Sequence, residues 1–99
     1  MLREMAEALD AMPVKELISG ELESYGQYCA LGVVGKARGL TMDMANIDPE
    51  DYSLVAKTFG IATALAQEIM YENDESWDSE TPAGRWTRMR QWVKEQIKP

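Results

Sequence analysis

The groups in this 99-residue sequence that could do chemistry are one thiol and a set of closely spaced carboxylates. Cys29 stands near the expected start of a helix, where the helix dipole could lower the pKa of its thiol. The sequence holds no histidine that could serve as a catalytic partner. We therefore predict that Cys29 is a small buried apolar residue. The lack of histidine also removes the usual zinc ligand sets, and a single cysteine excludes an internal disulfide.

Pairs of carboxylates at short spacing recur between residues 72 and 80 and could hold a hard cation such as calcium. The pairs are Glu72 with Asp74, and Asp78 with Glu80. The segment lacks the glycine and the ligand spacing of an EF-hand, so we interpret it as a solvated acidic loop. Neither a glycine-rich phosphate loop nor a serine nucleophile motif occurs in the chain. We therefore expect no enzymatic activity, no cofactor and no metal.

One stretch, VAKTFGIATALAQEIM at residues 55–70, has the spacing of a DNA-reading helix-turn-helix. Ala56 stands where the two helices would touch, and Gly60 stands at the turn. A recognition helix must offer arginine, lysine, asparagine or glutamine to bases and phosphates. Residues 63–72 offer only Gln67 beside two glutamates. We therefore interpret the stretch as a packed helical hairpin and do not expect residues 63–72 to bind nucleic acid.

Charge is distributed unevenly along the chain, whose formal net charge is −7. The acids concentrate in residues 48–75, where Lys57 is the only base, whereas residues 76–99 carry a basic excess. An acidic surface favours association with a basic partner, because complementary charge steers the encounter.

Two alternative binding sites follow from this distribution. The first is an acidic surface with exposed aromatic rings, the usual anchors of interfaces, for a protein partner with a basic surface. The residues of this site would be Glu68, Tyr71, Glu72, Asp74, Glu75 and Trp77. The second is a nucleic-acid-binding face on the basic C-terminal helix, where cations would contact phosphates. The residues of this alternative site would be Arg85, Arg88, Arg90 and Lys94.

The elements that must position these residues are predicted to be helices, because apolar residues recur every three or four positions. The expected helices cover residues 2–12, 28–39, 48–60, 63–71 and 81–97, with a short helical turn in 14–20 and loops at 21–27 and 72–80. The sequence thus predicts an all-α fold. It is a small bundle of four to five short helices in one domain over residues 1–99, and it contains the helix-turn-helix-like hairpin.

Glycines and caps set the expected helix boundaries. Asp48 with Pro49 should open the helix over 48–60, and Gly39 and Gly60 should end helices in the left-handed conformation. Glycines inside the helix over 28–39 weaken it by about 1 kcal/mol each, and close packing against another helix would explain them.

No apolar run approaches the roughly 20 residues that span a bilayer. The N-terminus has acidic residues where a signal peptide has a basic and then an apolar stretch. We therefore expect a cytoplasmic protein without a membrane partner.

Three segments, YCALGVVGKARG, IMYEND and RWTRMRQWVKEQI, follow one another over about residues 18–97. Together they are similar to small uncharacterised proteins of phages and bacteria. Those proteins carry a Cys-Cys-Leu-Gly stretch after a glycine-containing loop, then an Asn-Asp dipeptide after a helix, then a short amphipathic C-terminal helix. The matching positions are 28–32 and 73–74. Ala30 replaces the second cysteine, so the resemblance implies a mobile-element origin and no disulfide or metal role.

The expected function is that of a non-enzymatic, acidic interaction protein of phage type. It would inhibit a host defence complex, as anti-CRISPR proteins do, by occupying a basic surface built for nucleic acid. The alternative is a small DNA-binding regulator derived from helix-turn-helix proteins that uses the basic C-terminal helix. In either case the protein could act as a homodimer.

Overall fold

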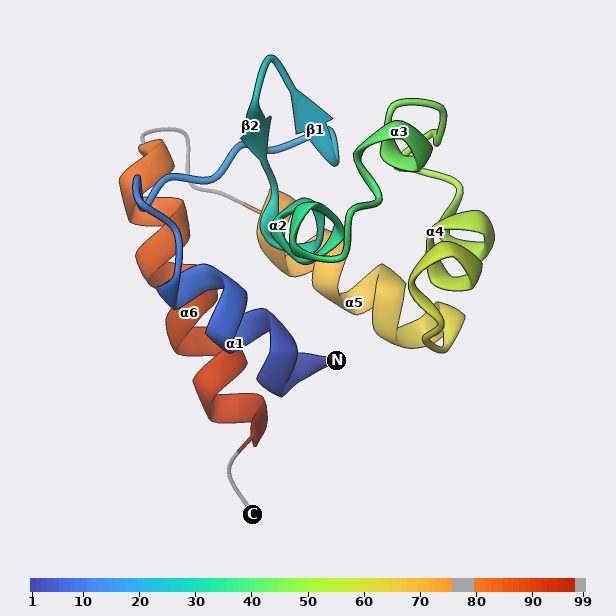
Figure 1. Ribbon diagram of the computed structural model, residues 1–99. Coiled ribbons are helices and arrows are strands. Elements are labelled where there is room, and N and C mark those ends of the chain that lie inside the picture. Colours follow the sequence, from blue (N-terminus) through green and yellow to red (C-terminus); the bar gives the residue numbers. More distant parts are fainter. Residues whose placement is uncertain (76–79, 98–99) are drawn as a thin grey trace.

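In the computed structural model, which describes residues 1–75 and 80–97, the chain forms helices joined by short loops (Figure 1). One two-stranded antiparallel sheet consists of β1 (Glu23–Ser24) and β2 (Gln27–Tyr28). The prediction of a small, mostly helical fold is confirmed, and the single-turn α3 and the hairpin are additions to it. The described helices are α1 (Leu2–Asp10), α2 (Ala30–Ala37), α3 (Thr41–Met44), α4 (Tyr52–Phe59), α5 (Thr63–Asp74) and α6 (Pro82–Ile97).

The central helix is α2, and its sequence explains why. The segment ALGVVG is apolar on every side, so a helix made of it must be covered all round. All six of these residues are buried. Figure 1 shows α1 and α6 side by side on one flank of α2, α4 on the other flank, and α5 crossing behind.

The helices pack round one connected cluster of apolar side chains. The radius of gyration is 12.2 Å, close to the roughly 13 Å expected of a compact 100-residue domain. The largest fully buried apolar side chains come from both ends and the middle of the chain: Met5, Leu9, Leu17, Leu22, Leu31, Val34, Val55, Ile69, Met70, Met89 and Val93.

The predicted turn between α4 and α5 is present. Gly60 has a φ of 68° and the N–H of Ile61 donates to the carbonyl of Ala56 at 3.0 Å. This is the left-handed helix end that only glycine adopts without strain. Ala56 is buried at the contact, as the helix-turn-helix spacing predicted. The prediction of a packed hairpin with this turn is therefore confirmed.

The predicted start of the same helix was three residues too early. The side chain of Asp51 accepts the N–H of Leu54 and caps α4, which begins at Tyr52. The side chain of Asp48 instead accepts the N–H of Glu50 at 2.9 Å and stabilises a separate turn. Both aspartates are followed by acceptable helix starts, so the sequence alone did not distinguish them.

Other boundaries also differ from the sequence prediction, and α1 and α2 each end two residues earlier than predicted. Residues 14–20 form no helix, because the N–H of Leu17 donates to Pro82 and that of Ile18 to Tyr28, so tertiary bonds replace helical ones. The helix over 28–39 begins only at Ala30, since Tyr28 pairs with Glu23 in the sheet. Helix α5 continues through Asp74, beyond the expected end.

The two glycines inside α2 serve different contacts. A Cβ atom on Gly32 would overlap the backbone carbonyl of Leu22, whereas one on Gly35 would meet the side chains of Met44 and Phe59. The expected packing against another helix therefore holds for Gly35, and the neighbour of Gly32 is the segment that leads into the hairpin.

Within residues 1–75 and 80–97, no helix combines the length and the apolar character that crossing a bilayer needs.

Candidate functional site

The acidic residues predicted to bind a partner lie mostly on one line along α5. Glu68, Tyr71 and Glu72 lie three and four residues apart in α5, so their side chains share one face, and Glu75 follows at the C-terminal cap of the helix, where it accepts the Tyr71 hydroxyl. Glu68 and Glu75 are exposed, and Glu72 is half-buried. We call these four residues the acidic stripe.

Tyr71 is the aromatic residue of the acidic stripe, and its side chain is 60% exposed. Its hydroxyl donates to Glu75 at 3.1 Å. This hydrogen bond, together with the negative charges of Glu75 and Glu72, raises the pKa of the Tyr71 phenol above its ordinary value of 10.0. The phenol is therefore neutral at neutral pH, and Tyr71 presents an exposed, amphipathic ring next to carboxylates.

The two other predicted contact residues are not part of this line. Asp74 turns toward the loop before the hairpin, where its carboxylate accepts the N–H of Gly20 at 3.0 Å and the amide of Asn73 at 2.9 Å. Its contacts hold a loop in place, although the residue itself is exposed. Trp77 lies outside the described residues.

The cations predicted as an alternative nucleic-acid site are used largely inside the protein. Arg85 is only 7% exposed, and its guanidinium donates to the carbonyl of Leu17 at 3.1 Å. Its Nε, which makes no hydrogen bond, lies 3.4 Å from the carboxylate of Glu80. The sequence placed Arg85 off the buried face of its helix, and the structure places it in the interior.

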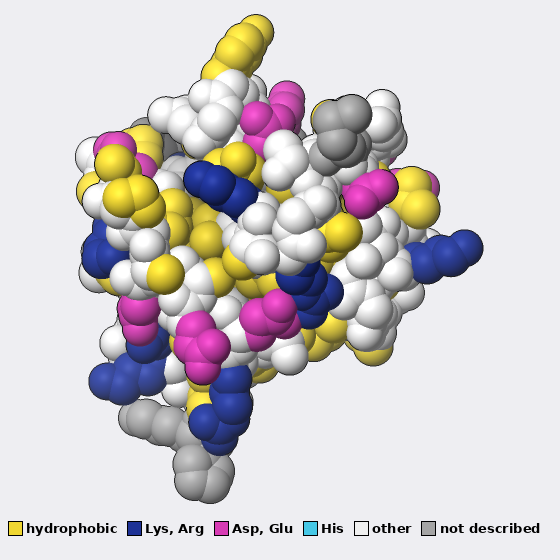
Figure 2. Space-filling view, in the orientation of Figure 1, with side chains coloured by type: hydrophobic (Ala, Val, Ile, Leu, Met, Phe, Trp, Pro, Cys, Tyr) yellow, Lys and Arg dark blue, Asp and Glu magenta, His cyan; other side chains and the backbone are white. Residues whose placement is uncertain are grey.

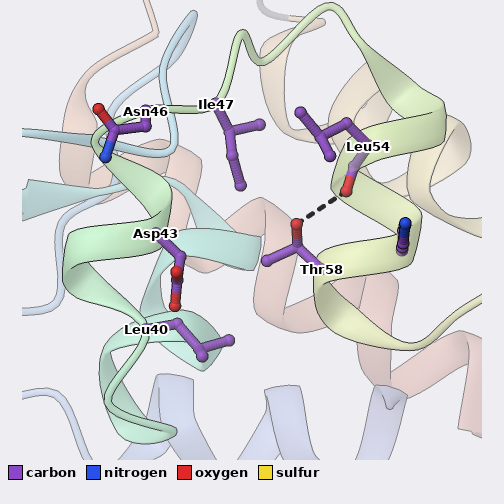
Figure 3. Close-up of a pocket in the computed structure, with 7 residues that line it drawn as sticks. Leu40, Asp43, Asn46, Ile47, Leu54 and Thr58 are labelled. Atoms are coloured by element: carbon purple, nitrogen blue, oxygen red, sulfur yellow. Dashed lines mark hydrogen bonds between the residues drawn. The ribbon is translucent and has the colours of Figure 1, made fainter.

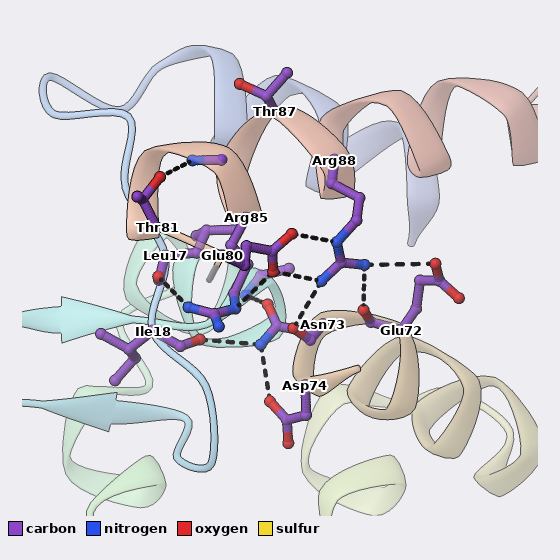
Figure 4. A network of polar contacts seen from close by, with 12 residues as sticks. Leu17, Ile18, Glu72, Asn73, Asp74, Glu80, Thr81, Arg85, Thr87 and Arg88 are labelled. Carbon is purple, nitrogen blue, oxygen red and sulfur yellow. Dashed lines mark hydrogen bonds and ion pairs between the residues drawn. The ribbon is translucent and has the colours of Figure 1, made fainter. Parts of the chain in front are cut away.

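Arg88 ties α6 to the end of α5, as Figure 4 shows. It donates to the carbonyl oxygens of Glu72 and Asn73 at 2.6 and 3.2 Å, and to both carboxylate oxygens of Glu80. The last carbonyls of a helix have no partner within the helix, and a cation there also opposes the helix dipole. Arg88 therefore acts as a C-terminal cap supplied by another helix.

The remaining two cations of this set lie farther along α6. Arg90 makes two hydrogen bonds with Asp10 of α1, at 2.7 and 2.9 Å. Lys94 is exposed and forms no ion pair with the described part of the chain. The structure thus leaves one of the four predicted cations fully available for a phosphate.

The arginines change the titration of their carboxylate partners. The hydrogen bond from Arg88 holds the pKa of Glu80 below its ordinary value of 4.5. The hydrogen bond from Arg90 holds the pKa of Asp10 below its ordinary value of 3.8. These carboxylates are therefore ionised at neutral pH and neutralise much of the positive charge of α6. Among residues 1–75 and 80–97, the one ion pair to the acidic stripe is at Glu72, which lies 3.5 Å from Arg88.

The surface of α5 that would face DNA in a helix-turn-helix carries no cation. Thr63, Ala64, Gln67 and Glu68 are its exposed residues in the first two turns. These groups cannot neutralise phosphates, which supply most of the affinity for DNA. The packed hairpin is therefore present without the chemistry of a recognition helix.

The start of α2 and the end of α5 meet at a buried asparagine. The side chain of Asn73 accepts the N–H of Ala30 at 2.9 Å and donates to the carbonyl of Ile18 at 3.0 Å (Figure 4). Asn73 is completely buried. Because its side-chain oxygen accepts an N–H from the first turn of α2, Asn73 caps the start of α2 from the end of α5. Sequence reasoning noted the Asn-Asp dipeptide but gave it no role. Its position at the end of an amphipathic helix was the available signal.

Cys29 is a free, buried cysteine. Its thiol accepts the N–H of Gly32 at 3.4 Å as the N-terminal cap of α2. Burial raises the pKa of the thiol to about 12. The prediction of a buried apolar residue is confirmed, and the thiol is protonated at neutral pH.

A hollow of about 520 Å³ lies between α3 and α4 (Figure 3). Leu40, Ile47 and Leu54 supply its apolar wall. The hydroxyl of Thr58 points at the same space but donates to the carbonyl of Leu54 at 2.8 Å. Asp43, Asn46 and Lys57 complete the lining, so the hollow combines an apolar wall with polar and charged groups. Among residues 1–75 and 80–97, no group of His, Cys, Asp or Glu is arranged to hold a metal ion.

Comparisons with protein-family models, with curated proteins and with solved structures found no match to this chain.

Proposed function

We propose that this protein is a non-enzymatic interaction protein whose acidic stripe binds a basic surface of another protein. The observation that supports this function is the exposed Tyr71 ring, which follows Glu68 on α5, adjoins Glu72 and donates its hydroxyl to Glu75. Aromatic anchors surrounded by polar groups are the usual centres of protein interfaces. Negative charge around such an anchor favours a partner rich in arginine and lysine.

The partner surface that fits this chemistry is a groove built for nucleic acid. Such grooves carry rows of cations spaced to meet phosphates, and a line of carboxylates along a helix can occupy the same cations. The similarity of three segments to small phage and bacterial proteins is consistent with inhibition of a host defence complex in this way. The protein would then act by competition and would need no catalytic group.

The DNA-binding regulator is the weaker alternative. It requires cations on the surface of α6, and Arg85, Arg88 and Arg90 are held by carboxylates and carbonyl groups of the same chain. A homodimer, which the sequence also suggested, would involve a different part of the surface, beside the hairpin turn.

A fluorescein-labelled nona-arginine peptide is a suitable probe for the acidic stripe, with fluorescence anisotropy as the measurement. The double variant Glu68→Gln with Glu75→Gln removes two exposed charges from the stripe. We expect about tenfold weaker binding, since each exposed ion pair contributes up to about 1 kcal/mol. Tyr71→Ala should weaken binding further through loss of the anchor.

The matched control is Glu7→Gln with Glu16→Gln, which removes the same charge from exposed positions outside the stripe. We expect the control to bind within about twofold of the unchanged protein. Equal weakening in both double variants would mean that only net charge matters, and would contradict the proposed site. Titration of labelled duplex DNA at low salt tests the alternative, and binding that falls steeply with salt would favour the regulator.

A further inference from the structure

The turn of the hairpin carries a tyrosine that the fold itself does not use. Tyr25 is fully exposed with a φ of 51°, and Gly26 follows with a φ of 77°. Two consecutive residues with positive φ form a type I′ turn, in which the first position favours asparagine or glycine. An aromatic residue is strained there and buries no surface. Its presence therefore points to a contact outside the chain.

An apolar groove lies beside this turn. It consists of two adjoining cavities of about 250 and 180 Å³, and both are lined by Met12, Pro13, Val33 and Lys36. The larger cavity runs between α1 and α2, and the smaller one extends to Gly26 of the turn. Each exceeds the roughly 30 Å³ that a water molecule occupies in the liquid, so the groove can admit a side chain. We call it the α1–α2 groove.

The surface view agrees with this description. Figure 2 shows hydrophobic side chains gathered in a hollow beside α2, with a basic side chain lying across its upper part. A hydrophobic side chain also projects from the top of the molecule, where Figure 1 places the hairpin turn.

The charge of the groove limits what can occupy it. Lys36 is the only charged residue among those that line the two cavities, and its ammonium lies 5.3 Å from the ring centre of Tyr28. The fitting occupant is therefore an apolar or aromatic side chain with a carboxylate next to it. The hairpin turn of this same chain has that composition, because Glu23 accepts the N–H of Gly26 at 3.0 Å and so stays beside Tyr25.

We propose that two copies of this chain form a dimer in which Tyr25 of each copy enters the α1–α2 groove of the other, and Glu23 faces Lys36. Gly26 belongs to the turn and also lines the groove. Turn and groove are thus neighbours in one patch, as a twofold contact requires, because both copies use the same surface. The patch is small, so the dimer belongs to the weak class that buries less than about 1,200 Å². This contact is separate from the acidic stripe and does not rest on the function proposed above.

Sedimentation equilibrium of the full chain from about 1 μM to 1 mM covers the affinities expected of such a dimer. Tyr25→Asn removes the anchor and supplies the residue that a type I′ turn prefers. We expect at least tenfold weaker dimerisation together with a melting temperature of the diluted monomer raised by roughly 4–8 °C. Tyr71→Asn, at the other exposed tyrosine, is the matched control and should leave dimerisation unchanged.

A charge exchange tests the pairing directly. Lys36→Glu and Glu23→Lys should each weaken the dimer, because each places like charges opposite one another, and the double variant should restore it. The salt dependence distinguishes this dimer contact from the binding that we propose for the acidic stripe. Each copy carries a net charge of −7, so salt should strengthen dimerisation by screening the repulsion and should weaken binding of the arginine peptide.

A protein that stays monomeric at every concentration would overturn the proposal and would assign the groove to a different protein. Dimerisation that survives Tyr25→Asn, or that the double charge exchange fails to restore, would also overturn it. Loss of the dimer in a Tyr25→Asn protein that melts at a higher temperature would support it, since destabilisation could not then explain the loss.

Discussion

Replacement of Asn73 tests the contact that joins α5, α2 and the loop before the hairpin. In Asn73→Ala, the fully buried Ala30 N–H loses its only acceptor outside the helix. An unsatisfied buried donor costs about 1–3 kcal/mol, and the lost bond to the half-buried Ile18 carbonyl adds about 1 kcal/mol. The higher helix propensity of alanine returns about 0.5 kcal/mol. We expect the free energy of unfolding to fall by about 1.5–3.5 kcal/mol.

Urea and thermal denaturation followed by circular dichroism measure this loss. A decrease of about 1.5–3.5 kcal/mol corresponds to a melting temperature lower by roughly 6–28 °C in a domain of this size. The control is Gln67→Ala, an exposed position on the same helix, which should change stability by less than about 0.5 kcal/mol. An Asn73→Ala protein as stable as this control would refute the assigned role.

Asn73→Asp separates the acceptor from the donor function of this side chain. The carboxylate keeps an acceptor for Ala30 but places negative charge beside the carbonyl of Ile18 and the carboxylate of Asp74, where the amide donated. We expect strong destabilisation at neutral pH that diminishes as the pH falls toward the ordinary aspartate pKa of about 3.9, because burial raises the pKa of the new carboxyl and protonation removes the charge and restores a donor. A deficit that does not change with pH would argue that lost packing, and not the lost donor, is responsible.

Three further predictions follow from the buried contacts. Gly32→Ala should destabilise the protein by about 3 kcal/mol or more, because the new Cβ meets the backbone carbonyl of Leu22. The Cβ of Gly35→Ala meets the flexible side chain of Met44, so this variant should cost less than about 1 kcal/mol. Equal effects of the two variants in urea denaturation would contradict this prediction. Glu80→Gln should lower stability at pH 7 by about 3 kcal/mol, since Arg85 and Arg88 lose their shared carboxylate. The pKa of Glu80 is lower in the folded state, so the contribution of its carboxylate to stability is complete above pH 4.5 and is lost as the pH falls through the folded pKa. The Glu80→Gln variant should therefore lose less stability than the unchanged protein between pH 5 and pH 3. An unchanged pH profile would count against the pairing. Cys29, with a thiol pKa of about 12 and no exposure, should react with a disulfide reagent at pH 8 only as fast as the protein unfolds, and rapid labelling of the folded protein would show that the thiol is accessible.

Local signals predicted the helices well. The spacing of apolar residues located α1, α4, α5 and α6, and Gly60 ended α4 in the left-handed conformation as expected. These features depend on neighbours within four residues, which a single sequence displays. The same spacing placed three of the six predicted acidic-site residues, Glu68, Tyr71 and Glu72, on one side of α5, because a helix fixes which residues share a face.

The interior polar groups could not be predicted in this way. Arg85 looked like a surface cation, and it is buried because Glu80 and the carbonyl of Leu17 converge on it from other segments. Residues 14–20 looked capable of a helical turn, and they form none because their N–H groups bond to Pro82 and Tyr28. In both cases the partner is distant in sequence, so local propensity did not reveal it.

The sequence by itself determined which segments are helical, where α4 ends, and that α5 lacks the cations of a DNA-reading helix, because each of these depends on local spacing and residue type. Only the tertiary structure decided which charges remain on the surface. It paired the arginines of α6 with Glu80 and Asp10, left Glu68 and Glu75 in solvent, and set the apolar groove beside the exposed Tyr25. Pairing and exposure depend on which segments meet in space, and the packing of α2 between its neighbours fixes that.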